Sequence, residues 1–141
     1  MSVPGRKILF ALNMVIPLVC GLIIYVTKAE NTFVSDVFRA LRTVIEPVKY
    51  PLIIRNYACD FLWAYSLFFC IRITLGDNLK GKHGITVIAV TVVVSMVLEF
   101  LQLAKAFHGT FDWLDIVAEL SAIAVALIIS TIIERRSKNE T

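Results

Sequence analysis

Four long apolar runs, separated by polar segments, dominate the pattern of hydrophobic and polar positions along the chain. They cover residues 8–26, 57–75, 85–103 and 113–133, and charged side chains fall mainly near their ends. A helix that crosses the roughly 30 Å hydrocarbon core of a bilayer needs about 20 predominantly apolar residues. We therefore expect an all-α integral membrane protein with four transmembrane helices, formed as a single domain by residues 1–141.

The first run has a second interpretation, because Arg6 and Lys7 precede it as they would precede a secretory signal peptide. Its apolar stretch is longer than the roughly 7–15 residues of a signal-peptide core, and no convincing small-residue cleavage site follows it. We therefore favour a transmembrane helix.

Between the first two runs, residues 32–46 follow the period of an amphipathic helix. Phe33, Val37 and Leu41 recur on one face, polar and charged residues fill the other, and Pro47 ends the pattern. Such a segment is typical of a helix that rests in the membrane interface. A lid over a polar pocket is the alternative.

Composition supports a membrane protein and excludes other classes. Hydrophobic residues make up 58% of the 141 residues and charged residues 18%, and the mean hydropathy is +0.80. This is too little polar surface for a soluble globular domain. The net charge of +3 comes from scattered basic residues and not from a basic stripe, which argues against a nucleic-acid partner. The three cysteines lie in apolar runs without metal-ligand spacing, so we interpret them as packing residues.

Orientation follows from the distribution of Lys and Arg between the two sides of the membrane. Four spans place both termini and the connection at residues 76–84 on one side, which carries more Lys and Arg than the other. By the positive-inside rule, both termini are predicted to be cytoplasmic. Most acidic residues then lie on the outer side, where we look for chemistry.

The acidic residues of the third and fourth spans share helix faces. Glu99 and Gln102 are three residues apart, and Asp112, Asp115 and Glu119 follow at steps of three and four. Side chains at these spacings lie on one face of a helix. Only a short segment joins the two spans, so we expect a hairpin that brings both acidic ends to the same level. Ionisable residues inside a membrane usually face a protein interior or a water-filled cavity and mark a functional site.

Three further polar residues lie near this level: Asp60 in the second span, Arg55 before it, and His108 between the third and fourth spans. Carboxylates with an amide oxygen suit a divalent cation such as Mg²⁺ or Ca²⁺ as a cofactor. Arg55 and His108 could instead contact a phosphate, and the carboxyl groups could carry protons. The plain alternative is that the acids reach to water and that Arg55 forms an ion pair with Asp60. The candidate metal ligands are Glu99, Asp115 and Glu119.

The sequence Glu99-Phe-Leu-Gln102, followed after a short turn by Asp112-Trp-Leu-Asp115-Ile-Val-Ala-Glu119, resembles the VanZ-like family of small bacterial membrane proteins. The family pattern is roughly Glu-x-x-Gln, a turn that usually contains Arg, and then Asp-x-x-Asp-x-x-x-Asn. The resemblance covers residues 50–130, where the segment from Asn56 through Asp60 to Tyr65 resembles the Asp and aromatic pattern of an earlier span.

This chain departs from the family pattern at three places. His108 and Gly109 stand where the turn usually has Arg, Glu119 replaces the usual Asn, and Ala122 and Ala126 stand where the family often has Gly. The first change removes a fixed positive charge, and the second adds a negative one. If the family site binds an anion through the Arg, this chain is expected to bind a cation, to use His108, or to have lost the activity.

The resemblance implies a location in the bacterial cytoplasmic membrane and an association with resistance to the glycopeptide teicoplanin. Our leading hypothesis is a membrane binding or accessory protein. It would engage a lipid head group, a lipid-linked cell-envelope precursor or an amphipathic antibiotic at the outer leaflet. The binding residues would be Glu99, Gln102, Asp115 and Glu119.

Two other classes of function stay open. One is an enzyme that acts on a polar membrane lipid, with a metal-bound water or with Glu99 as the acid–base catalyst. The other is a proton- or cation-coupled transporter built as a homo-oligomer. Against the transporter, the carboxyl groups lie away from the membrane midplane, and the sequence has no inverted repeat.

Overall fold

A computed structural model of the chain describes residues 3–27, 48–75, 82–103 and 112–139. These residues form the α-helices α1 (Val3–Thr27), α4 (Leu52–Leu75), α5 (Lys82–Leu103) and α6 (Trp113–Asn139). All four helices in this part of the chain are long and apolar enough to cross a membrane. The prediction of an all-α protein with four transmembrane helices is confirmed. The amphipathic helix predicted over residues 32–46 lies outside the described residues.

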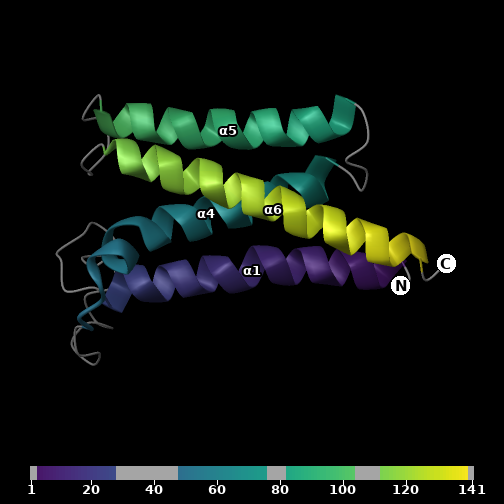
Figure 1. Cartoon of the computed structure of the whole chain (residues 1–141), viewed down its shortest axis with the longest axis horizontal. Coiled ribbons are helices and arrows are strands. Elements are labelled where there is room, and N and C mark those ends of the chain that lie inside the picture. The colour runs from purple at the N-terminus through teal and green to yellow at the C-terminus, as the bar shows by residue number, and fades with distance from the viewer. Residues whose placement is uncertain (1–2, 28–47, 76–81, 104–111, 140–141) are drawn as a thin grey trace.

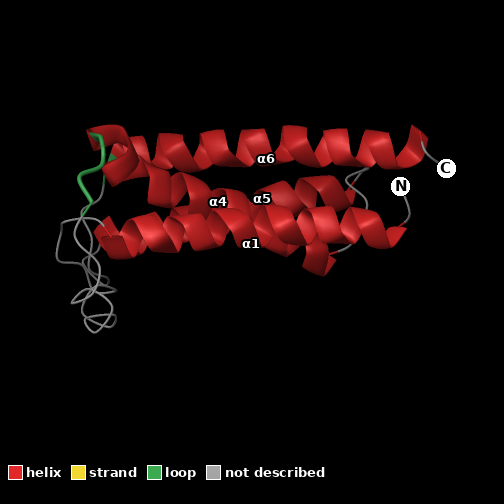
Figure 2. Ribbon diagram, turned by 90° about the horizontal axis from the view of Figure 1, so that it is seen from below, coloured by secondary structure: helices red, strands yellow, loops and turns green. Residues whose placement is uncertain are grey.

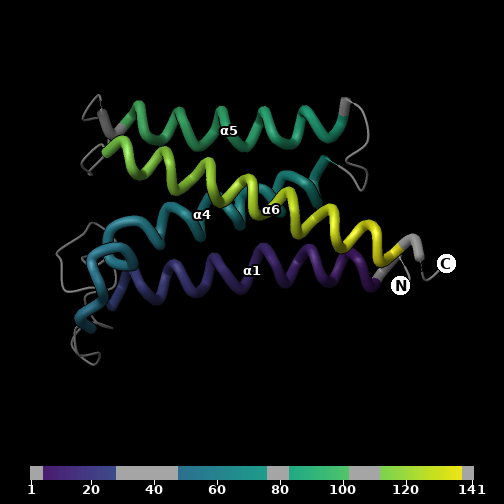
Figure 3. The backbone as a smooth tube through the Cα atoms, viewed as in Figure 1, coloured from purple at the N-terminus to yellow at the C-terminus, as the bar shows by residue number. Residues whose placement is uncertain are grey.

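The helices run alternately in opposite directions along one long axis (Figures 1 and 2). The backbone trace in Figure 3 shows the two ends of the chain close to the same end of the bundle. The other end holds the C-terminal ends of α1 and α5 and the N-terminal ends of α4 and α6. We call it the acidic end, because Asp60, Glu99, Asp115 and Glu119 lie in the halves of α4, α5 and α6 that meet there.

The helices extend beyond the apolar runs that predicted them. Helix α1 begins at Val3, α4 begins at Leu52, and α6 continues to Asn139. At the start of α4, the Arg55 N–H donates to the Pro51 carbonyl at 2.9 Å, which closes the first turn. Each helix is longer than its apolar run because hydropathy marks the residues that suit hydrocarbon, whereas a helical backbone continues wherever its hydrogen bonds can form.

An aromatic core joins α1 and α4. The ring centroids of Phe10 and Phe69 are 5.8 Å apart, and Phe68 meets Phe69 edge to face at 5.6 Å. All three side chains are fully buried, and they pack with Val87 of α5 and Ile123 of α6. Rings at these distances and angles stabilise helix packing beyond simple surface burial. The core therefore binds the helices together in the half of the bundle that lies away from the acidic end.

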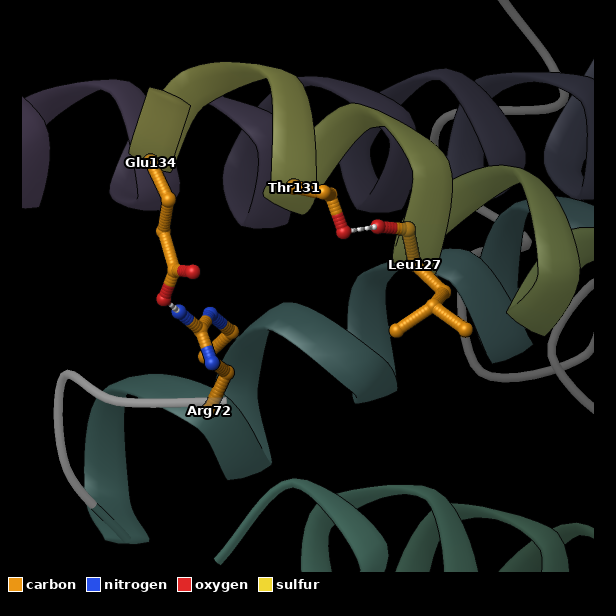
Figure 4. A network of polar contacts seen from close by, with 4 residues as sticks. All are labelled: Arg72, Leu127, Thr131 and Glu134. Carbon is orange, nitrogen blue, oxygen red and sulfur yellow. Dashed lines mark hydrogen bonds and ion pairs between the residues drawn. The ribbon is translucent and has the colours of Figure 1, made fainter. Parts of the chain in front are cut away.

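A buried ion pair connects α4 and α6. Arg72 donates through Nη2 to Oε1 of Glu134, and Figure 4 shows the two side chains reaching toward each other. Arg72 is fully buried, and its guanidinium carbon lies 4.9 Å from the centre of the Phe10 ring. In the sequence, both residues are charges near the ends of apolar runs. Their pairing could not be predicted, because the packing of α4 beside α6 brings together residues that are distant in sequence.

Candidate functional site

Four carboxyl groups from three helices form the centre of the site. The carboxyl of Glu119 interacts electrostatically with those of Glu99, Asp60 and Asp115, and Glu99 interacts with Asp115 in the same way. Asp60 lies on α4, Glu99 on α5, and Asp115 and Glu119 on α6. We call these four residues the acidic cluster. The structure thus brings together three acids of the predicted hairpin and adds Asp60 from a helix outside it.

The two glutamates of the cluster are almost completely buried. Glu99 is 3% exposed and Glu119 is 2% exposed. In each, the buried Oε2 has no hydrogen-bond partner among the residues that the structure describes. A buried polar oxygen without a donor is costly, and a buried charge is costlier still. The cluster is therefore suited to receive hydrogen-bond donors that carry positive charge.

The polar wall of the site continues inward along α5. Thr91 and Ser95 lie two turns and one turn from Glu99 on the same face, and both are fully buried. The Thr91 hydroxyl donates to the Val87 carbonyl at 2.7 Å. The Ser95 hydroxyl has no such partner in the described part of the chain. Ser95 therefore adds a hydrogen-bonding group on the inner side of the cluster, before the aromatic core begins.

Asp112 lies at the exposed rim and has a structural role. Its Oδ1 accepts from the Leu114 N–H at 3.1 Å, and its Oδ2 accepts from the Tyr57 hydroxyl at 3.3 Å. The first bond caps the N-terminus of α6, which leaves backbone N–H groups in need of acceptors. The second ties α6 to α4. These two contacts give Asp112 a structural role that requires no ligand.

We expect Asp112→Ala to lower the free energy of unfolding by about 1 kcal/mol, the usual cost of losing an N-cap. Asp112→Asn should keep most of this stability, because an asparagine oxygen also accepts from the Leu114 N–H. Both variants can be compared by reversible unfolding in mixed detergent micelles. Equal stability of Asp112→Ala and the wild type would contradict the capping role.

The other predicted site residues are less central or are not described. Arg55 lies in the first turn of α4, where its Nε donates to Oδ1 of Asn56 at 3.2 Å. Gln102 belongs to α5, but its side chain is not among those described. His108 lies outside the described residues, so its proposed contact with a phosphate stays a prediction.

The geometry does not favour a metal centre. Within the described ranges, no three His, Cys, Asp or Glu side chains are placed to hold a metal ion together. Glu99, Asp115 and Glu119 therefore interact as neighbouring charges, and the structure gives no support to their joint role as Mg²⁺ or Ca²⁺ ligands. The catalytic role of Glu99 stays a prediction, and its position in the acidic cluster is the observation that is consistent with it.

Comparisons with models of protein families, with curated proteins and with solved structures find no match to this chain. The resemblance to the VanZ-like family stays a prediction from sequence. A fold alone does not specify an activity, so the function has to be argued from the chemistry of the acidic cluster.

Proposed function

We propose that this multi-pass membrane protein is a binding or accessory protein that holds the positively charged head group of an amphiphile in the acidic cluster. The observation that carries the proposal is the pair of buried oxygens, Oε2 of Glu99 and Oε2 of Glu119, that accept no hydrogen bond from any described residue. An ammonium group donates three hydrogen bonds and carries the compensating charge. Charge-assisted hydrogen bonds of this kind are stronger than neutral ones.

The same observation favours the cationic members of the ligand classes that the sequence left open. Lipid head groups, cell-envelope precursors and amphipathic antibiotics can all carry amines, and a protonated amine complements four nearby carboxyl groups. A bare phosphate would face repulsion from these groups. Arg55, the described basic residue nearest to the cluster in sequence, already hydrogen-bonds to Asn56. A cationic ligand is therefore the best fit.

The proposed location is the bacterial cytoplasmic membrane, with both termini in the cytoplasm. The acidic cluster lies at the end of the bundle away from the termini (Figure 1), so this orientation directs it to the outer leaflet. Lipid head groups, envelope precursors and externally added antibiotics are present there. A contribution to glycopeptide resistance follows only from the VanZ-like resemblance and is part of the proposal.

Native mass spectrometry of the protein extracted with its own membrane lipids tests the proposal. We expect the wild type to retain an amine-bearing amphiphile. Glu99→Gln should retain about tenfold less, because losing one buried counter-charge costs a ligand at least 1.4 kcal/mol. Glutamine keeps the size of the side chain and removes only its charge.

Asp77→Asn is the matched control, because it removes one acidic charge at a residue that lies between α4 and α5 in the sequence and is not a member of the acidic cluster. We expect it to retain the amphiphile as the wild type does. Equal retention by wild type and Glu99→Gln would contradict the proposal, as would a bound lipid that lacks an amine.

The enzyme and transporter alternatives gain no specific support. A metal-dependent enzyme needs a ligand group that the described residues do not supply. A transporter needs a path across the membrane. The fully buried Phe68 and Phe69 and the Arg72–Glu134 pair fill the bundle beyond the cluster. A bundle filled in this way fits binding at one end better than transport.

A further inference from the structure

A groove between α1 and α4 lies beside the acidic cluster. It has a volume of about 330 Å³, and its lining includes Leu18, Leu22 and Tyr25 of α1 and Cys59, Asp60 and Trp63 of α4. Most of this lining is apolar. Asp60 belongs to both places, because it lines the groove and its carboxyl interacts with that of Glu119.

Close contact between the two helices forms part of the groove wall. A Cβ atom added at Gly21 would lie 3.5 Å from the Cβ of Leu62, which is ordinary van der Waals distance. The Cys59 thiol donates to the Gly21 carbonyl with a sulfur to oxygen distance of 3.7 Å. Leu62 and Cys59 of α4 thus meet α1 at Gly21, and Gly21 and Cys59 line the groove at this contact.

The exposure of the lining shows which surroundings the groove meets. Leu18, Leu22 and Trp63 are each between 41% and 47% exposed, and all three lie within spans that cross the membrane. At this depth the surroundings are hydrocarbon, so the natural occupant is a hydrocarbon chain. Asp60 places one carboxyl group of the acidic cluster at the groove, and the buried Oε2 atoms of Glu99 and Glu119 in the same cluster accept no hydrogen bond from a described residue. A chain that carries a cation is therefore favoured over a neutral one.

We propose that the groove holds the hydrocarbon chain of an amphiphile whose protonated amine reaches the acidic cluster at Asp60. This inference rests on the proposed function and extends it, because it names a long-chain amine as the ligand class. The groove would contact the hydrocarbon chain. Asp60, which lines the groove and belongs to the acidic cluster, would contact the head group where the chain begins. Selection for the amine comes from the cluster, and selection for chain length comes from the groove.

Photolabelling in phosphatidylcholine nanodiscs tests the inference. The probes are an octadecylamine that carries a diazirine in its chain and the matching octadecanol. We expect the amine to label residues 18–25 and 59–63 about fivefold more than the alcohol does, a modest preference of about 1 kcal/mol. Peptide mass spectrometry locates the label. Equal labelling by both probes would overturn the inference, because it would show only general contact with lipid.

Two substitutions in α1 separate the groove from the neighbouring lipid-facing surface. Leu22→Trp fills the groove with a larger side chain and should remove the preference for the amine in residues 18–25 and 59–63. Ile23→Trp makes the same change at a side chain that is 53% exposed and outside the groove lining, and it should leave the preference unchanged. If both variants lost the labelling preference for the amine, or if neither did, the result would contradict a site for the hydrocarbon chain in the groove.

The outcomes distinguish this inference from the proposed function. If native mass spectrometry shows amine retention that depends on Glu99 but the amine does not prefer the groove, the groove proposal is wrong and the proposed function stands. If the amine prefers the groove but Glu99→Gln changes neither retention nor labelling, the cluster proposal is wrong and so is its link to the groove.

Discussion

Glu134→Met is expected to lower the free energy of unfolding by about 3–5 kcal/mol, the usual cost of removing one member of a buried ion pair. Arg72 is fully buried between α1, α4 and α6, and a guanidinium group does not lose its proton in a protein. The variant would leave this charge in the core without the Glu134 carboxylate. Unfolding in mixed micelles with increasing denaturing detergent measures the change.

The double variant Arg72→Met/Glu134→Met distinguishes the charge effect from a loss of packing. When both charges are replaced by apolar side chains of similar size, the desolvation cost disappears, and such replacements are often neutral or stabilising. We therefore expect the double variant to unfold within about 1 kcal/mol of the wild type or at higher stability.

Arg136→Met serves as a control, because Arg136 is an exposed basic residue on the same helix. Its replacement should change stability by less than about 0.5 kcal/mol. If Glu134→Met were as stable as the wild type, the pair would have no role in holding α4 against α6.

The spans were predictable because a membrane helix needs a long apolar run, and few other structures produce one. The ends of the helices were not predictable from the same signal. Residues 134–139 are strongly polar, yet they continue α6. Glu134 contacts Arg72 inside the bundle, so a polar sequence there does not mean a surface position.

The candidate site was predictable where its residues share one helix or one hairpin. Steps of three and four residues placed Asp115 and Glu119 on one face, and the short connection to Glu99 implied a hairpin. Asp60 was a candidate because it lies near the same membrane level, but its interaction with Glu119 and the Arg72–Glu134 pair depend on how α4 packs against α6, and no local spacing specifies that packing. The contribution of Ser95 could have been found, because Thr91, Ser95 and Glu99 recur at steps of four.

Glu119→Lys is expected to weaken amine binding by about 100-fold, compared with about tenfold for Glu119→Gln. The reason is competition as well as lost attraction. A lysine at position 119 of α6 carries its own ammonium into the space between Asp60, Glu99 and Asp115, which are the groups that would hold the ligand. Retention of the amine in native mass spectrometry, measured over a series of added concentrations, gives the two affinities.

The stability of the same variants tests whether the acidic cluster is a site for a positively charged group. If the acidic cluster is a cation site, Glu119→Lys should unfold at a stability equal to or above that of Glu119→Gln, because its ammonium takes the place of the bound cation. A lysine that is buried without suitable partners costs several kcal/mol instead. A Glu119→Lys variant that is several kcal/mol less stable than Glu119→Gln, or one that still retains the amine, would contradict the proposed function. The comparison needs no knowledge of the natural ligand, because the tethered ammonium group of the lysine is itself the probe.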